Sequence, residues 1–121
     1  MTALSESERR CLQKYVALLR SQLAGRLHSV QLFGSAARGD MWGPDQTFHS
    51  DIDVLVVTRE PLADEEAEAL VNETYPLYLE CGRQISPQFF SLARYETSNA
   101  DIDCAVLEEV ARDGQLLFSS D

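Results

Sequence analysis

Two short apolar segments, each meeting a polar motif at one end, constrain the fold of this chain more than any other feature. The first segment, residues 29–33, runs directly into a Gly-Ser pair. The second, residues 52–58, is nearly continuous in its apolar character and begins within an Asp-x-Asp pattern. Segments of this composition are typical of strands, and the second is expected to be buried on both faces. The chain therefore predicts a sheet that carries its polar motifs at strand ends.

The Gly-Ser pair, Gly34 and Ser35, has the form of a phosphate cradle. A helix that starts here presents free backbone N–H groups and the positive end of its dipole to an anion. Gly34 has no side chain to keep a phosphate away from the backbone, and Ser35 adds a hydroxyl donor. Arg38 can contact a triphosphate or extend into solvent. Because such turns also occur without a ligand, the second motif decides between these interpretations.

The two aspartates, Asp51 and Asp53, are two residues apart on an expected strand and therefore share one face. Two strand steps separate them by roughly 7 Å, so their carboxylates can converge on one Mg²⁺ or on two ions about 4 Å apart. Like charges beside a buried strand repel and lose hydration unless a cation compensates them, although a solvated strand end also tolerates them. Ser50 can hydrogen-bond the strand start or the metal shell. We therefore predict a metal site with Asp51 and Asp53 as ligands.

Together these motifs resemble the signature of the DNA polymerase beta nucleotidyltransferase superfamily, in which Gly-Ser and Asp-x-Asp occupy one active site. The short chain and the run from Gly34 to Gly39 are similar to the minimal nucleotidyltransferase (MNT) domains, many of which are antitoxins for HEPN-domain toxins. The resemblance implies a nucleotidyltransferase fold and a Mg²⁺-dependent transfer of a nucleoside monophosphate from an NTP, with AMP from ATP as the expected case, to a hydroxyl acceptor. It implies catalytic, metal-binding roles for Asp51 and Asp53, and nucleotide binding by Gly34, Ser35, Arg38 and Ser50.

Two departures from the family pattern bear on activity. The family usually places the two motifs closer together, so residues 41–49 resemble a short insertion that forms a lip over the site. Active members also carry a third carboxylate on a neighbouring strand, and the corresponding segment here, Arg83 to Ser91, contains no acid. Ser86, Gln88 or Glu96 is left to take that place. The alternative function is therefore an interaction module with weak or no turnover that neutralises a partner by binding alone.

Composition and charge bound the domain organisation and the partner. With 121 residues, of which 45% are apolar and 25% charged, the chain predicts a single globular domain over residues 1–121; the resemblance implies that this is one minimal nucleotidyltransferase domain. Its formal charge of −10 argues against a nucleic-acid partner, because phosphate-binding surfaces need clustered Lys and Arg. The charge favours a basic protein partner or simply solubility. The expected partner is a HEPN-type toxin, with a homo-oligomer as the alternative.

The sequence shows no sign of a membrane segment or a disulfide framework. No apolar run approaches the ~20 residues that span a bilayer, and the N-terminus lacks a basic region followed by an apolar one. We therefore expect a cytoplasmic protein without membrane contact. The cysteines, Cys11, Cys81 and Cys104, are odd in number and widely spaced among apolar positions. This pattern favours reduced packing residues over a disulfide framework or a zinc site.

Helical periodicity, end signals and prolines predict the remaining elements. The expected elements are a helix from the capping box Ser5-Glu8 to about Gly25, a helix from Asp64 to Cys81 that Pro76 kinks or breaks, a strand from Arg83 to Ser91 that Pro87 confines to an edge or a bulge, a helix over residues 100–112, and a packed tail or small strand over residues 115–118. The expected fold is α/β, or α+β in some schemes. It is a small mixed sheet with helices packed on one face and the acidic cleft on the other.

Overall fold

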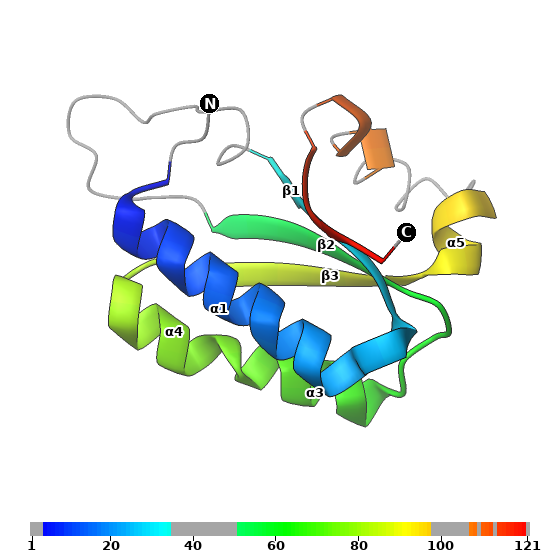
Figure 1. The fold of residues 1–121 in the computed structure, drawn as a ribbon, viewed down its shortest axis with the longest axis horizontal. Coiled ribbons are helices and arrows are strands. Elements are labelled where there is room, and N and C mark those ends of the chain that lie inside the picture. Colours follow the sequence, from blue (N-terminus) through cyan, green and yellow to red (C-terminus); the bar gives the residue numbers. More distant parts are fainter. Residues whose placement is uncertain (1–3, 35–50, 98–106, 109, 113, 121) are drawn as a thin grey trace.

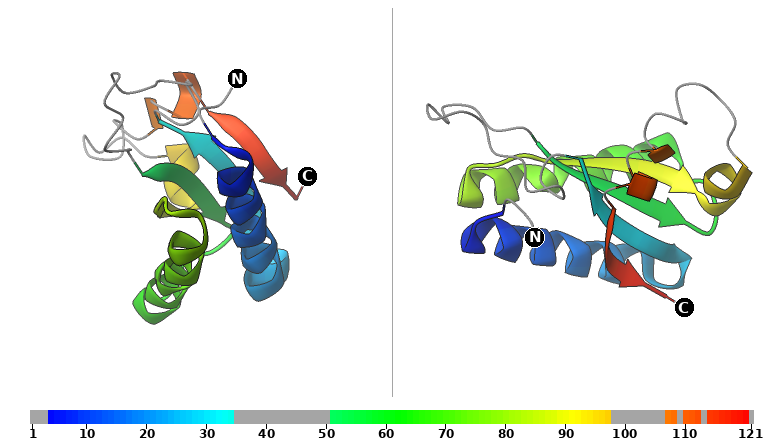
Figure 2. Two further views of the ribbon diagram at one scale, coloured as in Figure 1. Left: turned by 90° about the vertical axis from the view of Figure 1, so that its left-hand side faces the viewer. Right: turned by 90° about the horizontal axis from the view of Figure 1, so that it is seen from above.

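A computed structural model describes residues 4–34, 51–97, 107–108, 110–112 and 114–120 of the chain. Its elements, in chain order, are α1 (Glu6–Leu23), the 3-10 helix η1 (Ala24–Arg26), β1 (Leu27–Phe33), β2 (Ile52–Thr58), α3 (Asp64–Asn72), α4 (Thr74–Cys81), β3 (Ile85–Ser91), α5 (Leu92–Thr97) and β4 (Gln115–Ser119). The strands form one layer, and α1, α3 and α4 form a second layer along one side of it (Figures 1 and 2). None of the described helices is long and apolar enough to span a membrane.

The four strands form one mixed sheet in the order β3-β2-β1-β4. β1 runs antiparallel to both β2 and β4, whereas β2 and β3 are parallel. The parallel pair is joined through α3 and α4, which supply the crossover that parallel strands need. β3 lies at a sheet edge, which confirms the position predicted from Pro87, because a proline cannot donate to a ladder. The apolar tail forms the other edge strand, β4.

The main core lies between the sheet and the helix layer. It includes Tyr15 and Leu19 of α1, Val54 of β2 and Ile85 at the start of β3, each of which is 1% exposed or less. Core residues recur at helical spacing on α1 and at alternate positions on the strands, so the two layers seal against each other. The Tyr15 hydroxyl donates to the Leu70 carbonyl oxygen at 2.9 Å, which satisfies this polar group inside the core. β2 is buried on both faces, as its sequence predicted.

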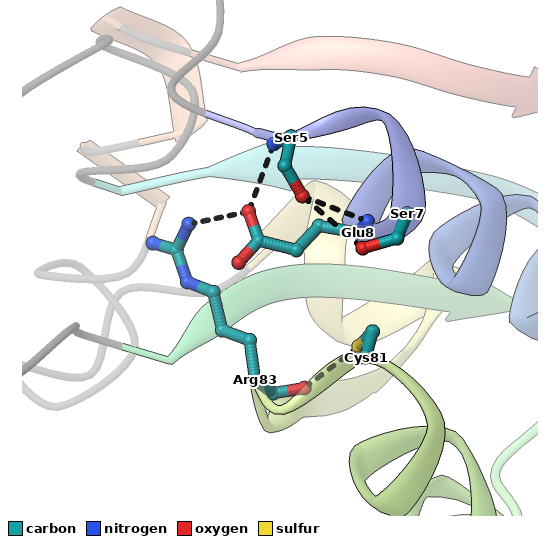
Figure 3. A network of polar contacts seen from close by, with 5 residues as sticks. All are labelled: Ser5, Ser7, Glu8, Cys81 and Arg83. Atoms are coloured by element: carbon teal, nitrogen blue, oxygen red, sulfur yellow. Dashed lines mark hydrogen bonds and ion pairs between the residues drawn. The ribbon is translucent and has the colours of Figure 1, made fainter.

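The N-terminus of α1 is fixed by the capping box that the sequence predicted (Figure 3). The Glu8 N–H donates to Ser5 Oγ at 3.1 Å, and the Ser5 N–H donates to Glu8 Oε1 at 2.9 Å. The Arg83 guanidinium donates to the same Glu8 oxygen at 3.4 Å, and the two side chains are only 7% and 15% exposed. This buried ion pair ties the start of α1 to the segment before β3. The helix ends at Leu23 and passes into η1, in agreement with the predicted stop near Gly25.

The helix predicted over residues 64–81 is two helices, α3 and α4, separated at Glu73. Pro76 is the third residue of α4, where its missing N–H has no helical acceptor to lose. In a continuous helix the ring of Pro76 would clash with the Asn72 carbonyl, so the helix is interrupted directly after Asn72. The Thr74 hydroxyl donates to the Val71 carbonyl oxygen at 2.6 Å, directly at the break. The sequence predicted that Pro76 either kinks or breaks this helix, and the structure shows a break.

Two of the three cysteines are free thiols used in packing, as the sequence predicted. Cys11 is buried against α4, where its Sγ donates to the Leu77 carbonyl oxygen at 3.6 Å and to Glu80 Oε2 at 3.5 Å. Burial first, and then the neighbouring Cys81 thiol, raise the pKa of Cys11 from 9.0 to about 12. Cys11 therefore stays protonated at neutral pH. Cys104 lies outside the described residues.

The opposite face of the sheet carries a smaller cluster instead of a second full layer. Its buried members are Phe33, Leu55, Val57, Phe90 and Val110, and Leu92, Tyr95 and Leu107 pack against them. The predicted helix layer on one face is thus confirmed for α1, α3 and α4, while α5 covers part of the other face. Of the last predicted helix, residues 107–108 and 110–112 are helical, and the rest lies outside the described residues.

Candidate functional site

Three strand ends meet at one edge of the sheet, where the two sequence motifs come together. The register pairs Phe33, the last residue of β1, with Asp53 near the start of β2. Asp53 in turn pairs with Ser86 near the start of β3. Gly34 follows Phe33 directly. The structure therefore brings one residue of the Gly-Ser motif against one residue of the Asp-x-Asp motif, although the two lie far apart in the chain.

Gly34 is held against the Asp53 carboxylate. Its φ of +77° lies in the left-handed region, which residues with a side chain rarely adopt. A Cβ placed on this residue would lie 2.5 Å from Asp53 Oδ2 and 3.4 Å from the Asp53 carboxyl carbon. The shorter distance is well inside van der Waals contact. Glycine is therefore needed at this position for two reasons. It adopts the left-handed backbone conformation, and it has no Cβ to overlap the Asp53 carboxylate.

Asp51 and Asp53 stand at the start of β2, on the side of the sheet away from the helix layer. Ile52 between them is fully buried in the main core, whereas Asp51 is exposed and Asp53 is partly buried. The Ile52 N–H donates to the Gln84 carbonyl oxygen at 2.8 Å, which fixes the strand start against the segment before β3. Because side chains alternate along a strand, this anchoring directs both carboxylates to the same face.

The paired carboxylates fit a hard divalent cation. They offer the oxygen ligands that Mg²⁺ prefers, and the exposure of Asp51 leaves room for water or phosphate oxygens in the same shell. The space that a Cβ would fill at Gly34 adjoins one of these carboxylate oxygens. Within the described ranges, no group of three or more His, Cys, Asp and Glu side chains is placed to hold a metal ion. A cation bound here by these two residues thus needs further ligands from water or from a bound phosphate.

The strand register separates the three residues that the sequence left for the place of a third carboxylate. Ser86 pairs with Asp53 and shares its face of the sheet. Gln88 lies two residues farther along β3, on the same face as Ser86. Glu96 belongs to α5, which follows the end of β3 that pairs with Thr58, roughly 17 Å from Asp53 along the strand. Ser86 is therefore the neighbour of Asp53 in the register, and the idea that Glu96 reaches the site stays a prediction.

Part of the predicted site lies outside the described residues. Of the predicted nucleotide-binding residues, the structure places Gly34, while Ser35, Arg38 and Ser50 fall in the range that is not described, as does the insertion over residues 41–49. The proposed roles of these residues in the site stay predictions.

Sequence reasoning missed one pair of residues at this edge, Arg83 and Glu8 (Figure 3). Arg83 lies two residues before Ile85, the first core residue of β3, so it faces the helix layer and not the carboxylates. An arginine at an inward position needs a buried acceptor, and this spacing is the signal that the sequence offered. The pair supports the start of β3 from the helix side, directly beside Gln84 and Ile52.

Comparison with protein families decides what kind of domain this is. Residues 14–81, more than half of the chain, match the model of the nucleotidyltransferase domain. The chain belongs to the nucleotidyltransferase domain family. The matched region contains Gly34, Asp51 and Asp53. A protein of Methanocaldococcus jannaschii, whose name proposes that it is a protein adenylyltransferase, is 30% identical over 112 residues, which are 93% of this chain and 99% of that protein.

Solved structures share the nucleotidyltransferase fold with this chain. A chain in the complex of a tri-AMPylated HEPN toxin of Shewanella oneidensis with its MNT antitoxin matches with a TM-score of 0.56 and 20% identity, over 93% of this chain and 72% of its own length. A spectinomycin adenyltransferase from Enterococcus faecialis, solved with ATP and spectinomycin, matches with a TM-score of 0.70 and 19% identity, over 93% of this chain and 56% of its own length. Both likenesses support the fold predicted from the sequence.

Proposed function

We propose that this nucleotidyltransferase moves a nucleoside monophosphate, AMP from ATP, onto a hydroxyl group of a partner protein. The observation that carries the proposal is the contact between Gly34 and Asp53, where a glycine backbone and a carboxylate oxygen adjoin a space that any side chain would fill. Membership in the family supports the transfer. In the reaction, the acceptor oxygen bonds to the α-phosphorus, the bond to pyrophosphate breaks, and the hydroxyl proton is released.

The residues of the proposed site divide into two groups. Asp51 and Asp53 would hold one or two Mg²⁺ ions, which would offset the negative charge of the phosphates. Gly34 allows the phosphates to approach the backbone at the end of β1. The proposed nucleotide-binding residues are Gly34, Ser35, Arg38 and Ser50. In this proposal residues 1–121 act as one minimal nucleotidyltransferase domain.

A HEPN-type toxin is the proposed partner and acceptor, and the protein then acts as an antitoxin. Two relatives support this choice. The name of the relative with 30% identity proposes protein adenylylation, and the complex of similar fold joins an AMPylated HEPN toxin to an MNT antitoxin. The net charge of −10 also suits contact with a basic protein surface.

Transfer of label from ATP tests the proposal. The protein is incubated with Mg²⁺, ATP labelled at its α-phosphate, and a purified HEPN toxin from the same genome. We expect label on the toxin, and a loss on the order of 100-fold in Asp51→Asn and in Asp53→Asn, because each variant removes one metal-ligating charge. Glu60→Gln, an exposed acid beyond the far end of β2, is the matched control and keeps full activity. Label that persists in both aspartate variants contradicts the proposal.

The position of Ser86 favours a second candidate function, an interaction module with weak or no turnover. Ser86 pairs with Asp53, and this candidate assigns to it the place that the third carboxylate has in active members of the family. This candidate predicts that the toxin binds wild type, Asp51→Asn and Asp53→Asn equally well while no label is transferred. Neutralisation of the toxin then depends on binding alone.

A gain-of-function variant distinguishes the two candidates further. Ser86→Asp adds a carboxylate on the face of Asp53, so we expect the affinity for Mg²⁺ to rise about tenfold in calorimetric titrations. Gln88→Asp adds a carboxylate two residues farther along the same face of β3 and serves as the control. If label transfer rises only in Ser86→Asp, the missing acid limits turnover. If it rises in neither variant, the lack of a third carboxylate does not explain weak activity.

A further inference from the structure

The outer side of α3 and α4 carries an exposed apolar stripe. Val71, Tyr75, Tyr78 and Leu79 are 41%, 61%, 41% and 64% exposed. They are four of the five large hydrophobic residues that are exposed in the described part of the chain. Single apolar residues are ordinary on a protein surface, whereas a contiguous group is typical of an interaction site. We call these four residues the α3–α4 stripe.

The stripe residues share one side of the helix pair, and an adjacent side is buried. Tyr75, Tyr78 and Leu79 are three or four residues apart on α4, which is the spacing of neighbours on a helix surface, and Val71 lies in the last turn of α3. On the inner side, Leu70 and Thr74 are 3% and 2% exposed. α1 lies along a different side of α4, where Lys14 pairs with Glu80 at 2.7 Å. Figure 2 shows α3 and α4 beside α1 under the sheet, at the outer margin of the helix layer.

The charged residues of the two helices themselves are all acidic. Residues 64–81 contain six acidic residues and no Lys or Arg. Two of the six form ion pairs with neighbouring elements, Glu66 with Arg26 and Glu80 with Lys14. The other four are exposed on the same two helices or at their junction: Asp64, Glu65, Glu68 and Glu73. The surface is therefore an apolar, partly aromatic strip flanked by exposed acidic residues. We call these four acidic residues the acidic rim.

We propose that the α3–α4 stripe is the docking surface for a basic amphipathic helix of a partner protein. The apolar side of such a helix covers the stripe, and its flanking Lys and Arg side chains meet the acidic rim. Tyr75 and Tyr78 suit this role, because each supplies a large apolar ring and a hydroxyl that accepts a hydrogen bond from a cation. A second copy of this chain fits less well, since a symmetric contact sets the two acidic rims against each other.

The stripe ends close to the candidate site. α4 ends at Cys81, and the carbonyl oxygen of Gln84 accepts from the Ile52 N–H at 2.8 Å, directly beside Asp51. A partner that docks along α4 is therefore held near the edge of the sheet that carries the two aspartates. The docking surface and the site share no residue, so the docking proposal goes beyond nucleotide transfer and does not depend on it.

A pair of fluorescent synthetic peptides tests the proposal. Both form a helix with leucines at positions i, i+4, i+7 and i+8, and the flanking positions are lysine in one peptide and glutamate in the other. At low ionic strength, anisotropy titrations of the full chain should show binding of the lysine peptide and none of the glutamate peptide. Added salt should weaken the binding, because it screens the charges. No nucleotide is present, so the result is independent of the activity of the site.

Matched variants locate the binding. Tyr75→Ser with Leu79→Ser should weaken the lysine peptide at least about tenfold, because it removes the two most exposed members of the stripe. Leu116→Ser on edge strand β4 is the control, since Leu116 is 62% exposed against 64% for Leu79. It should bind as wild type does. All variants should melt at the wild-type temperature in circular dichroism, because the replaced residues are exposed.

Several results overturn the proposal. Wild type that does not bind the lysine peptide, or that binds the glutamate peptide as tightly, excludes a basic helix as the occupant. Equal weakening in Leu116→Ser shows that the peptide does not bind at the stripe. A wild-type dimer in sedimentation that the double variant converts to a monomer assigns the surface to contact between copies of this chain instead.

Discussion

The two faces of strand β2 are used in different ways. The residues that face the helix layer are fully buried in the main core: Ile52, Val54 and Val56. On the other face, Leu55 and Val57 are equally buried, but Asp53 near the strand start is partly exposed and its carboxylate lies against Gly34. One face of β2 thus contributes only core residues. The other face contributes core residues along most of the strand and a polar site at its start.

The difference shows why the two carboxylates lie on this face of the sheet. Three helices close the helix-side face along its length, and a carboxylate placed there would lose its hydration without a partner. On the other face, α5 follows the end of β3 that pairs with Thr58, and among the described residues Asp51 at the strand start is exposed and Asp53 is partly exposed. Substitutions on the two faces should therefore separate stability from activity.

Ile52→Ala is expected to have the largest effect on stability. Ile52 is 0% exposed and its side chain lies in the main core, so its removal leaves a cavity and costs about 3 kcal/mol of unfolding free energy. Asp51→Asn changes the adjacent, exposed residue and should alter the unfolding free energy by less than about 0.5 kcal/mol. Urea unfolding followed by circular dichroism measures both. Equal losses in the two variants would show that the faces do not differ in this way.

Gly34→Ala is expected to have the next largest effect, and Gly82→Ala provides its control. The two glycines have nearly the same φ, +77° and +78°, so alanine meets similar backbone strain of about 1 kcal/mol at either position. A Cβ at Gly82 has no atom within 4 Å, whereas a Cβ at Gly34 overlaps Asp53 Oδ2. Gly34→Ala should therefore cost about 2 kcal/mol in urea unfolding, and only this variant should weaken nucleotide binding.

A double variant isolates the contact with the carboxylate. In Gly34→Ala with Asp53→Ala, the oxygen that the new Cβ would overlap is gone. The cost of the alanine at position 34 should then fall to that of Gly82→Ala, and the difference is the coupling between the two residues. A cost that stays unchanged in the double variant would mean that backbone strain alone explains Gly34.

The sequence predicted best what depends on local chemistry. The capping box at Ser5 and Glu8, the burial of β2 and the edge position of Pro87 each follow from residues that are near neighbours in the chain. Pro76 predicted that the helix over residues 64–81 is interrupted, because its ring excludes a regular turn before it. The meeting of Gly34 with Asp53 followed only from the resemblance to a known family, since nothing local joins the two motifs.

The sequence could not decide what depends on register. Choosing Ser86 from three candidates for the place beside Asp53 requires the pairing of β2 with β3, and a shift of one residue would turn every side chain to the other face. The contact of Arg83 with Glu8 joins residues 75 positions apart. Such contacts are set by the packing of whole elements, so composition and periodicity do not reveal them.

The smallest expected effect is the pH dependence of an ion pair in the helix layer. The Arg26 guanidinium donates to the Glu66 carboxylate at 2.7 and 3.0 Å, and the Ala63 N–H donates to it at 3.2 Å. These contacts, with Arg26 first, lower the pKa of Glu66 from 4.5 to about 2. Because the pKa is lower in the folded state, the stabilisation is complete above pH 4.5 and is lost as the pH falls toward 2. The side chains are 40% and 42% exposed, so solvent screens the pair and the effect is small.

Urea midpoints between pH 7 and pH 3 measure this effect and extend the comparison of the two faces. Glu66→Gln should lose stability less steeply with falling pH than wild type, whereas Glu65→Gln, its exposed neighbour, should follow the wild-type curve. Added Mg²⁺ should leave the contribution of Glu66 unchanged, because Arg26 already satisfies this carboxylate. It should raise the midpoint of wild type but not of Asp53→Asn, because a cation stabilises the folded state only where it binds. An equal rise in both proteins would place the Mg²⁺ away from Asp53.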